Sequence, residues 1–216
     1  DFYDLAVGNV PFGQYKVNDP AYNRLGFNIH NYFFAKALDQ VRPGGIVAFV
    51  TSRYTMDAKG KDVRKYLAER ADFLGAIRLP NNAFKANAGT EVVSDILFLQ
   101  KRDGVVANSI SLAPPHTAAA EFTHSAAPPF PTRPTDAGLA WGPQETELPD
   151  WVHTGENEDG FTINRYFLDH PEMVLGRQEP ESTAHGMDYT VNPIEGLELA
   201  DQLHDAVKYI RGTYQE

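Results

Sequence analysis

The chain has 216 residues, of which 42% are hydrophobic and 12% aromatic, which suits a globular protein with one domain of ordinary size and excludes a disordered segment. It contains no cysteine, which excludes disulfide frameworks, cysteine-based zinc or iron–sulfur sites and thiol nucleophiles. The formal net charge of −10 argues against a uniformly basic surface, and no apolar run approaches the roughly 20 residues that cross a bilayer, so we expect a cytoplasmic protein with no membrane partner.

Strands and helices alternate along the first half of the chain. Short apolar runs predict strands, and apolar residues that recur every three or four positions predict helices. Asn28 is expected to cap the first helix, and Pro43-Gly44-Gly45 to end it. Such alternation favours an α/β fold with a parallel sheet, and the last strand, which no helix precedes, is expected to close it as an antiparallel hairpin partner. The predicted elements are strands over residues 3–7, 46–50, 73–79 and 92–100, helices over 29–41 and 60–71, and loops over 14–28 and 80–89.

The composition changes near Gly104. Residues 1–103 carry 14 basic and 11 acidic residues, whereas the remaining residues carry 5 basic and 18 acidic ones. Residues 113–134 are rich in alanine, proline, serine and threonine, which is typical of a linker. We therefore divide the chain into a domain over 1–103, a linker or extended segment over 104–150, and a small helical extension over 151–216. An amphipathic helix is expected over 195–211 within that extension.

The turn after the first predicted strand has the groups to hold a planar amine. Asn9 offers an amide oxygen, and the carbonyl of Val10 offers a second acceptor close by. Pro11 stiffens the turn and has no N–H to compete, while Phe12 supplies a flat apolar face. Two acceptors that take both hydrogens of an exocyclic amine draw its lone pair out of ring conjugation, so the nitrogen can attack an electrophilic methyl group.

Residues 9–12, Asn-Val-Pro-Phe, resemble the Asn-Pro-Pro-Tyr/Phe motif of the amino-methyltransferases that use S-adenosylmethionine. Val10 replaces the first proline of that motif but keeps the carbonyl. The resemblance covers about residues 3–102 and is closest to the N6-adenine DNA methyltransferases of the large bacterial, plasmid and phage kind, which are often joined to helicase modules. The matching segments, in the family's order, are residues 9–12, 43–51 and 79–84, then Thr90 and the strand that ends in Lys101.

The resemblance implies the target-facing half of a Rossmann-like class I methyltransferase domain, with a less regular C-terminal extension. S-adenosylmethionine would be the cofactor and DNA the substrate. The glycine-rich turn that holds this cofactor normally precedes the motif, and it is absent from these residues, so cofactor-binding residues are not assigned. An upstream half or a partner subunit would supply them. The extension would recognise the target or dock another module, such as a helicase.

The resemblance also implies roles for individual residues. Asn9, Val10, Pro11 and Phe12 would form the catalytic turn, with Phe12 stacked on a base swung out of the duplex. Phe84, at the matching position of the closing hairpin, would be a second wall of the base pocket.

A basic stretch over residues 59–70 admits two interpretations. It includes Lys61, Arg64 and Lys65, which would contact DNA phosphates if that helix face met the substrate. The plain alternative is a solvated helix face. The histidines are scattered and predict no metal site.

Two other functions stay open from the sequence. The same turn occurs in enzymes that methylate glutamine side chains of proteins or bases of RNA. A chain without the cofactor motif is also compatible with a fragment that only binds partners and is inactive by itself.

Overall fold

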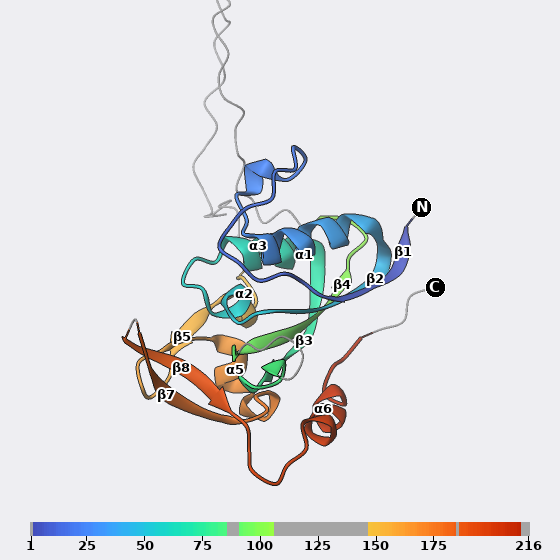
Figure 1. Cartoon of the computed structure of the whole chain (residues 1–216). Coiled ribbons are helices and arrows are strands. Elements are labelled where there is room, and N and C mark those ends of the chain that lie inside the picture. The colour runs from blue at the N-terminus through green and yellow to red at the C-terminus, as the bar shows by residue number, and fades with distance from the viewer. Residues whose placement is uncertain (1, 86–90, 106–146, 185, 213–216) are drawn as a thin grey trace, which may run out of the picture. The chain divides into compact units, whose positions relative to one another are not determined.

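The computed structural model describes residues 2–85, 91–105, 147–184 and 186–212 (Figure 1). The described residues up to 105 and those from 148 onward belong to one compact unit. The predicted linker segment over 113–134 lies outside the described residues. The domain assigned to 1–103 and the extension assigned to 151–216 therefore share a single unit in the structure.

A four-stranded sheet forms the centre of this unit. It consists of β1 (Tyr3–Asn9), β2 (Val41–Ser52), β3 (Ala71–Leu79) and β4 (Ser94–Lys101), in the order β1-β2-β4-β3. β1 pairs with β2 in parallel, and β4 is antiparallel to both β2 and β3. This confirms the predicted α/β architecture with an antiparallel closing strand. The sequence did not predict that β4 would insert between β2 and β3, which makes those two strands parallel to each other without direct pairing.

The helices of the first half pack against this sheet. α1 (Ile29–Gln40) and α3 (Asp62–Arg70) lie side by side over the sheet, and a short α2 (Tyr54–Asp57) follows β2 directly (Figure 1). Ala37 and Leu38 of α1 are buried, as the apolar period predicts, but Phe34 is also fully buried although it lies off the predicted stripe, and Phe33 on that stripe is only half-buried.

Two details at the ends of α1 differ from the prediction. The side chain of Asn28 does not cap the helix, because its amide donates to the side-chain oxygen of Gln14 at 2.9 Å. Pro43-Gly44-Gly45 does not follow a helix end either; it lies inside β2, which begins at Val41 immediately after α1. The register with β1 shifts over this segment, so the proline and the glycines are accommodated in an irregular part of the strand.

The extension is built mainly from hairpins, which corrects the expected small helical extension. Its two-stranded sheets pair β5 with β6 and β7 with β8. The sequence concealed them because two of the strands have only three residues and β7, Arg-Gln-Glu-Pro-Glu-Ser-Thr, has no apolar face. The elements are β5 (Thr154–Glu156), β6 (Thr162–Asn164), α5 (Arg165–Asp169), β7 (Arg177–Thr183), β8 (Gly186–Asn192) and α6 (Leu199–Val207), with short 3-10 helices at Asn23–Leu25, Asp150–Val152 and Pro171–Met173.

The extension packs directly on β3. Trp151 stacks on Phe73 with ring centroids 4.7 Å apart. Gly75 has a φ of 142°, and a Cβ added there would lie 2.7 Å from Cδ1 of Ile210, just beyond α6. A glycine at this point of β3 thus lets the end of the extension approach the strand. In the part of the chain that the structure describes, no helix is long and apolar enough to cross a membrane.

Candidate functional site

The predicted catalytic turn lies at the end of β1, where its side chains reach the surface. Asn9 is the last residue of the strand and pairs with Val50 of β2, and the backbone N–H of Val10 donates to the Val50 carbonyl at 3.1 Å. Asn9 and Pro11 are exposed, Val10 is buried, and Phe12 is half-buried against the core. No described residue hydrogen-bonds the amide of Asn9. The turn therefore offers an unoccupied acceptor beside an accessible aromatic ring.

Two close contacts hold the end of this turn in place. Tyr15 covers Gly13 so tightly that an added Cβ would lie 2.5 Å from the tyrosine ring. His30, on α1, is 2% exposed, and its ring donates a hydrogen bond to the Gly13 carbonyl. Nδ1 of His30 has no partner among the described residues. A histidine at a helix start is typically packed or a cap, and the burial of His30 agrees with that expectation; the local sequence does not show that its ring faces Gly13.

We expect the stability of the chain to depend on the protonation of His30. Burial lowers the pKa of its ring below the ordinary value of 6.5, so the unfolded chain binds the proton more readily than the folded chain does. The free energy of unfolding should therefore decrease as the pH falls below 6.5, and His30→Gln, which can still donate to Gly13, should reduce this decrease. Urea unfolding at a series of pH values measures the free energy of unfolding and its pH dependence. His170→Gln, at an exposed histidine, is the control; equal pH dependence in all three proteins would contradict the assignment.

The loop that carries Phe84 lies at the same edge of the sheet as the turn. Asn9 pairs with Val50, Val50 with Ile96, and Ile96 with Ile77, so one row of residues crosses all four strands. Three strand spacings of about 4.8 Å put β1 and β3 about 14 Å apart along this row. The loops after β1 and β3 therefore flank the ends of the two central strands, at the edge where α/β sheets usually bind their ligands.

The Phe84 loop is fastened to the extension. The backbone N–H of Asn81 donates to the Val191 carbonyl at 2.8 Å, and its side chain donates to Thr190 Oγ1 at 3.1 Å. Phe84 itself is half-buried and packs against the core. The loop is thus anchored to β8 three residues before Phe84.

A layer of buried charged side chains lies beneath this edge. Arg78 of β3 faces Asp95 of β4 and donates two hydrogen bonds to it, at 2.8 and 2.9 Å. Arg78 also donates to Asp57 of α2 at 2.9 Å, and Asp57 accepts the backbone N–H of Asn164 at 2.9 Å. Burial opposes the charge of Arg78, but the two carboxylates outweigh it and raise its pKa. The layer therefore joins β3, β4, α2 and the extension beneath this edge.

A second arginine at this edge extends the layer outward. Arg53 is 8% exposed and donates to Asp188 of β8 at 2.7 Å. Its guanidinium also lies 4.4 Å from the ring centroid of Tyr54, a half-exposed residue that opens α2. The sequence holds one clue to this network: charged residues within predicted strands, such as Arg78 and Asp95, are costly unless they are paired.

The structure corrects the role predicted for Arg64. Its side chain is 1% exposed and donates to the backbone carbonyls of Val152 and Ala58, at 2.9 and 2.8 Å. Burial lowers its pKa to about 10. Arg64 therefore fastens α3 to the extension and cannot contact DNA phosphates. Lys61 is exposed and Lys65 is half-exposed, so their predicted phosphate contacts stay a prediction.

The outer edge of β1 is open. β1 pairs with β2 on one side, and no described strand pairs with it on the other. Its side chains Tyr3, Leu5 and Val7 are 61%, 56% and 69% exposed, an unusual amount of apolar surface for one short strand. An unpaired strand edge with exposed apolar side chains is typical of a protein–protein interface.

The described residues do not fit the cofactor of the resembled family by themselves. β1 leads into the catalytic turn, and no glycine-rich turn follows an earlier strand, so no backbone cradle for S-adenosylmethionine can be assigned. Within the described ranges, no group of three or more histidine and carboxylate side chains is placed to hold a metal ion.

Comparison with known proteins gives a short stretch of sequence similarity. No model of a known protein family matches the chain. Over 117 residues, 52% of its length, the chain is 33% identical to a protein named defense against restriction protein B from Escherichia phage P1. That stretch is 5% of the phage protein, so the chain spans only a small part of the length of this relative.

Solved structures with partial similarity are S-adenosylmethionine-dependent methyltransferases, including modification subunits of restriction systems. One is a Listeria monocytogenes protein assigned to the class I methyltransferases, with 22% identity and a TM-score of 0.37 over 54% of this chain and 35% of that one. A second is a modification subunit assigned to a type I restriction enzyme of Vibrio vulnificus, with 21% identity and a TM-score of 0.39 over 49% and 24% of the two chains. At TM-scores below 0.5 these likenesses do not establish a shared fold.

Proposed function

We propose that this chain is the target-base half of an S-adenosylmethionine-dependent methyltransferase that acts on the N6 amine of adenine in DNA. The observation that carries the proposal is the turn over residues 9–12. Its asparagine amide is exposed at the carboxyl end of β1 and has no hydrogen-bond partner in the described ranges, and the half-buried ring of Phe12 lies three residues further along. This combination of acceptor and aromatic face suits a planar ring with an amino group.

In this proposal the chain prepares the amine for attack. The oxygen of Asn9 and the carbonyl of Val10 accept the two N6 hydrogens, which leaves the nitrogen lone pair free to point away from the ring. Phe12 stacks on the base, and Phe84 bounds it from the β3 side. When bound by its own half of the enzyme, S-adenosylmethionine supplies an electrophilic methyl group. The amine would take that methyl as the methyl–sulfur bond of the sulfonium breaks, its electron pair remaining on the departing thioether, and would release one proton to water.

We propose that the missing cofactor-binding half attaches at the open edge of β1. A cofactor-binding half that added a strand to the open edge of β1 would pair its free backbone groups, and the layer packed on that added sheet would cover Tyr3, Leu5 and Val7, which share one face of β1. It would also bring its cofactor to the side of the turn at Asn9. That half lies in the same polypeptide or in a partner subunit, and a helicase module is a further proposed partner in a cytoplasmic assembly.

The phage relative gives the proposal a context. Its name describes a defence against restriction, and base methylation is a chemical means of protecting DNA from restriction enzymes. The similarity extends over half of this chain, so we transfer the context only as part of the proposal.

Methyl transfer from labelled S-adenosylmethionine tests the substrate. We expect the chain, combined with a cofactor-binding half, to label duplex DNA at adenine and to label RNA and protein at least about 100-fold less, since the turn is proposed to hold a base swung out of DNA. The chain alone should show no transfer and no tight S-adenosylmethionine binding by calorimetry. Label in protein glutamine or in RNA would favour those alternatives, and no label in any substrate would favour a fragment that only binds partners.

A further inference from the structure

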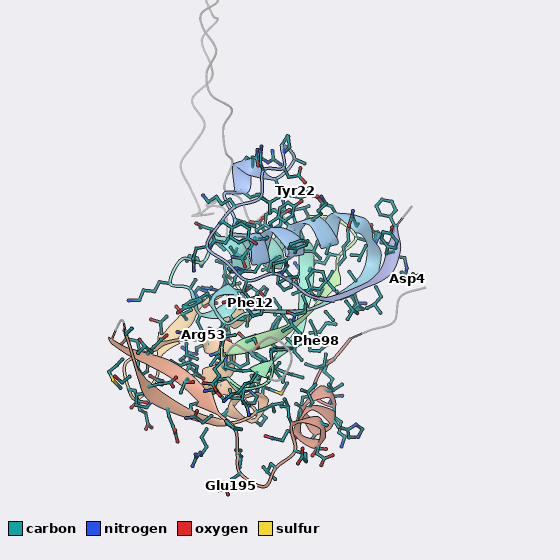
Figure 2. The ribbon with its side chains drawn as sticks, viewed as in Figure 1. Asp4, Phe12, Tyr22, Arg53, Phe98 and Glu195 are labelled. Carbon is teal, nitrogen blue, oxygen red and sulfur yellow. The ribbon has the colours of Figure 1, made fainter. Side chains whose placement is uncertain are left out.

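A hollow of about 300 Å³ lies on the loop between the catalytic turn and α1. Neither the turn nor the charged layer uses it. Three aromatic rings, two side-chain amides and one ammonium group line most of it: Tyr22, Phe27, Tyr32, Asn18, Asn23 and Lys16. Figure 2 labels Tyr22 on this loop, beyond α1, and Phe12 near α2.

The loop is held in shape from beneath. The carboxylate of Asp19 accepts the Tyr32 hydroxyl at 2.8 Å and the Lys36 ammonium at 3.1 Å, so α1 clamps the middle of the loop. The hydroxyl of Tyr22 donates to Asp39 at 2.7 Å, and its ring meets that of Tyr32 edge-on at 5.4 Å. The aromatic walls are therefore fixed before a ligand arrives, which lowers the cost of binding.

The polar groups of the hollow are partly unused. Lys36 is paired with Asp19, but Lys16 has no carboxylate partner in the described parts of the chain, nor has Arg24 on the same loop. The oxygen of Asn18 accepts from Asn23 at 2.9 Å, while its amide nitrogen has no hydrogen-bond partner within the described ranges. The hollow thus combines a free cation, a free amide donor and flat apolar walls. A phosphate, a base edge and a base face would satisfy these three features together.

The chain limits how far the hollow lies from the target base. Four residues separate Phe12 from Lys16, and an extended chain of that length spans at most about 14 Å. DNA rises 3.4 Å per nucleotide along one strand, so this reach corresponds to about four nucleotides. A nucleotide in the hollow would therefore be a near neighbour of the base held at the turn.

We propose that this hollow binds one nucleotide of the DNA strand that carries the target base, with its phosphate on Lys16 and its base among the aromatic walls. This inference rests on the proposed function, since the strand is presented by the base held at the turn. The loop would then bind the DNA strand beside the reacting nucleotide, where neither the turn nor Phe84 contacts the DNA.

The salt dependence of DNA binding tests this proposal. Fluorescence anisotropy with a labelled oligonucleotide, single-stranded and duplex, gives the dissociation constant of the 216-residue chain over a series of salt concentrations. We expect Lys16→Ala to weaken binding several-fold and to reduce the slope of log K against log salt by about 1, the value for one lost phosphate contact. Lys208→Ala, which removes an exposed lysine paired with Asp205, should leave the slope unchanged.

The outcomes are separable. Equal slopes for Lys16→Ala, Lys208→Ala and the unsubstituted chain would overturn the proposal, and so would the absence of DNA binding by the unsubstituted chain. Deoxyadenosine monophosphate that bound as tightly as the oligonucleotide would indicate a site for free nucleotides instead of a strand. Asn9→Ala tests the proposed function independently, because it should abolish methyl transfer while leaving the salt slope intact.

Discussion

Replacing Asn9 by alanine is expected to abolish methyl transfer while leaving the fold intact. The amide oxygen is one of two proposed acceptors for the target amine, and loss of one preorganised hydrogen-bonding group at a reacting centre commonly lowers the rate by about 100-fold to 1,000-fold. The side chain is exposed and makes no hydrogen bond to the described residues, so its removal should change the free energy of unfolding by less than about 0.5 kcal/mol. Labelled-methyl transfer and urea unfolding measure the two effects.

Two further variants make this experiment specific. Asn9→Asp keeps acceptor oxygens at the same place and should retain more activity than Asn9→Ala. Gln40→Ala removes an exposed amide at the end of α1, away from the turn, and should retain full activity. Full activity in Asn9→Ala would remove the proposed mechanism, and unfolding of that variant would show that Asn9 has a structural role instead.

The sequence predicted the local elements on either side of the turn better than it predicted how those elements assemble. The strand before the turn, the helix after it and the closing strands all follow from local periodicity, which a short window of residues contains. The exposure of Asn9 also follows, because a residue at the carboxyl end of a strand leaves the sheet. The position of β4 between β2 and β3 does not follow, because strand order depends on pairing between residues about 50 apart, such as Phe49 and Leu97.

Arg64 shows why a charge pattern can mislead. It belongs to a run of basic residues on a polar helix, which ordinarily predicts a solvated face. The structure buries it because Val152, 88 residues later in the chain, brings a backbone carbonyl to its guanidinium at 2.9 Å. No local pattern contains that partner. The neighbouring Lys61 remains exposed, so a single basic stretch divides into an internal anchor and a surface charge.

The contact of His30 with Gly13 and the hairpins of the extension were hidden for related reasons. A histidine at a helix start looks the same whether it faces solvent or the carbonyl of Gly13. The strand β7 is short of apolar residues because it is mostly exposed, and it is held by its antiparallel pairing with β8. Such strands are held by backbone pairing with a neighbouring strand and have no hydrophobic pattern of their own. The neighbouring strand can be identified only from the folded structure.

Removing the guanidinium of Arg78 is expected to cause the largest loss of stability among these substitutions. Arg78→Leu would leave Asp95 buried without its ion-pair partner and Asp57 with only the longer contact to Arg53 at 3.5 Å, and breaking a buried ion pair in this way costs about 3–5 kcal/mol. Arg78→Lys keeps the charge but loses the forked geometry that serves both carboxylates, so an intermediate loss is expected. Urea unfolding of the three proteins measures the order of stability.

An exposed ion pair provides the matched control for Arg78. Arg165 pairs with Asp169 at 3.2 Å on the surface of α5, and Arg165→Leu should cost no more than about 1 kcal/mol. Equal losses in Arg78→Leu and Arg165→Leu would show that the buried layer adds nothing to the fold. A large loss confined to Arg78→Leu would instead indicate that the layer joins β3 and β4 to α2 and the extension, since Arg78 pairs with Asp57 and Asp57 accepts the backbone N–H of Asn164. The extension would then be part of the structural base of the edge where the turn lies.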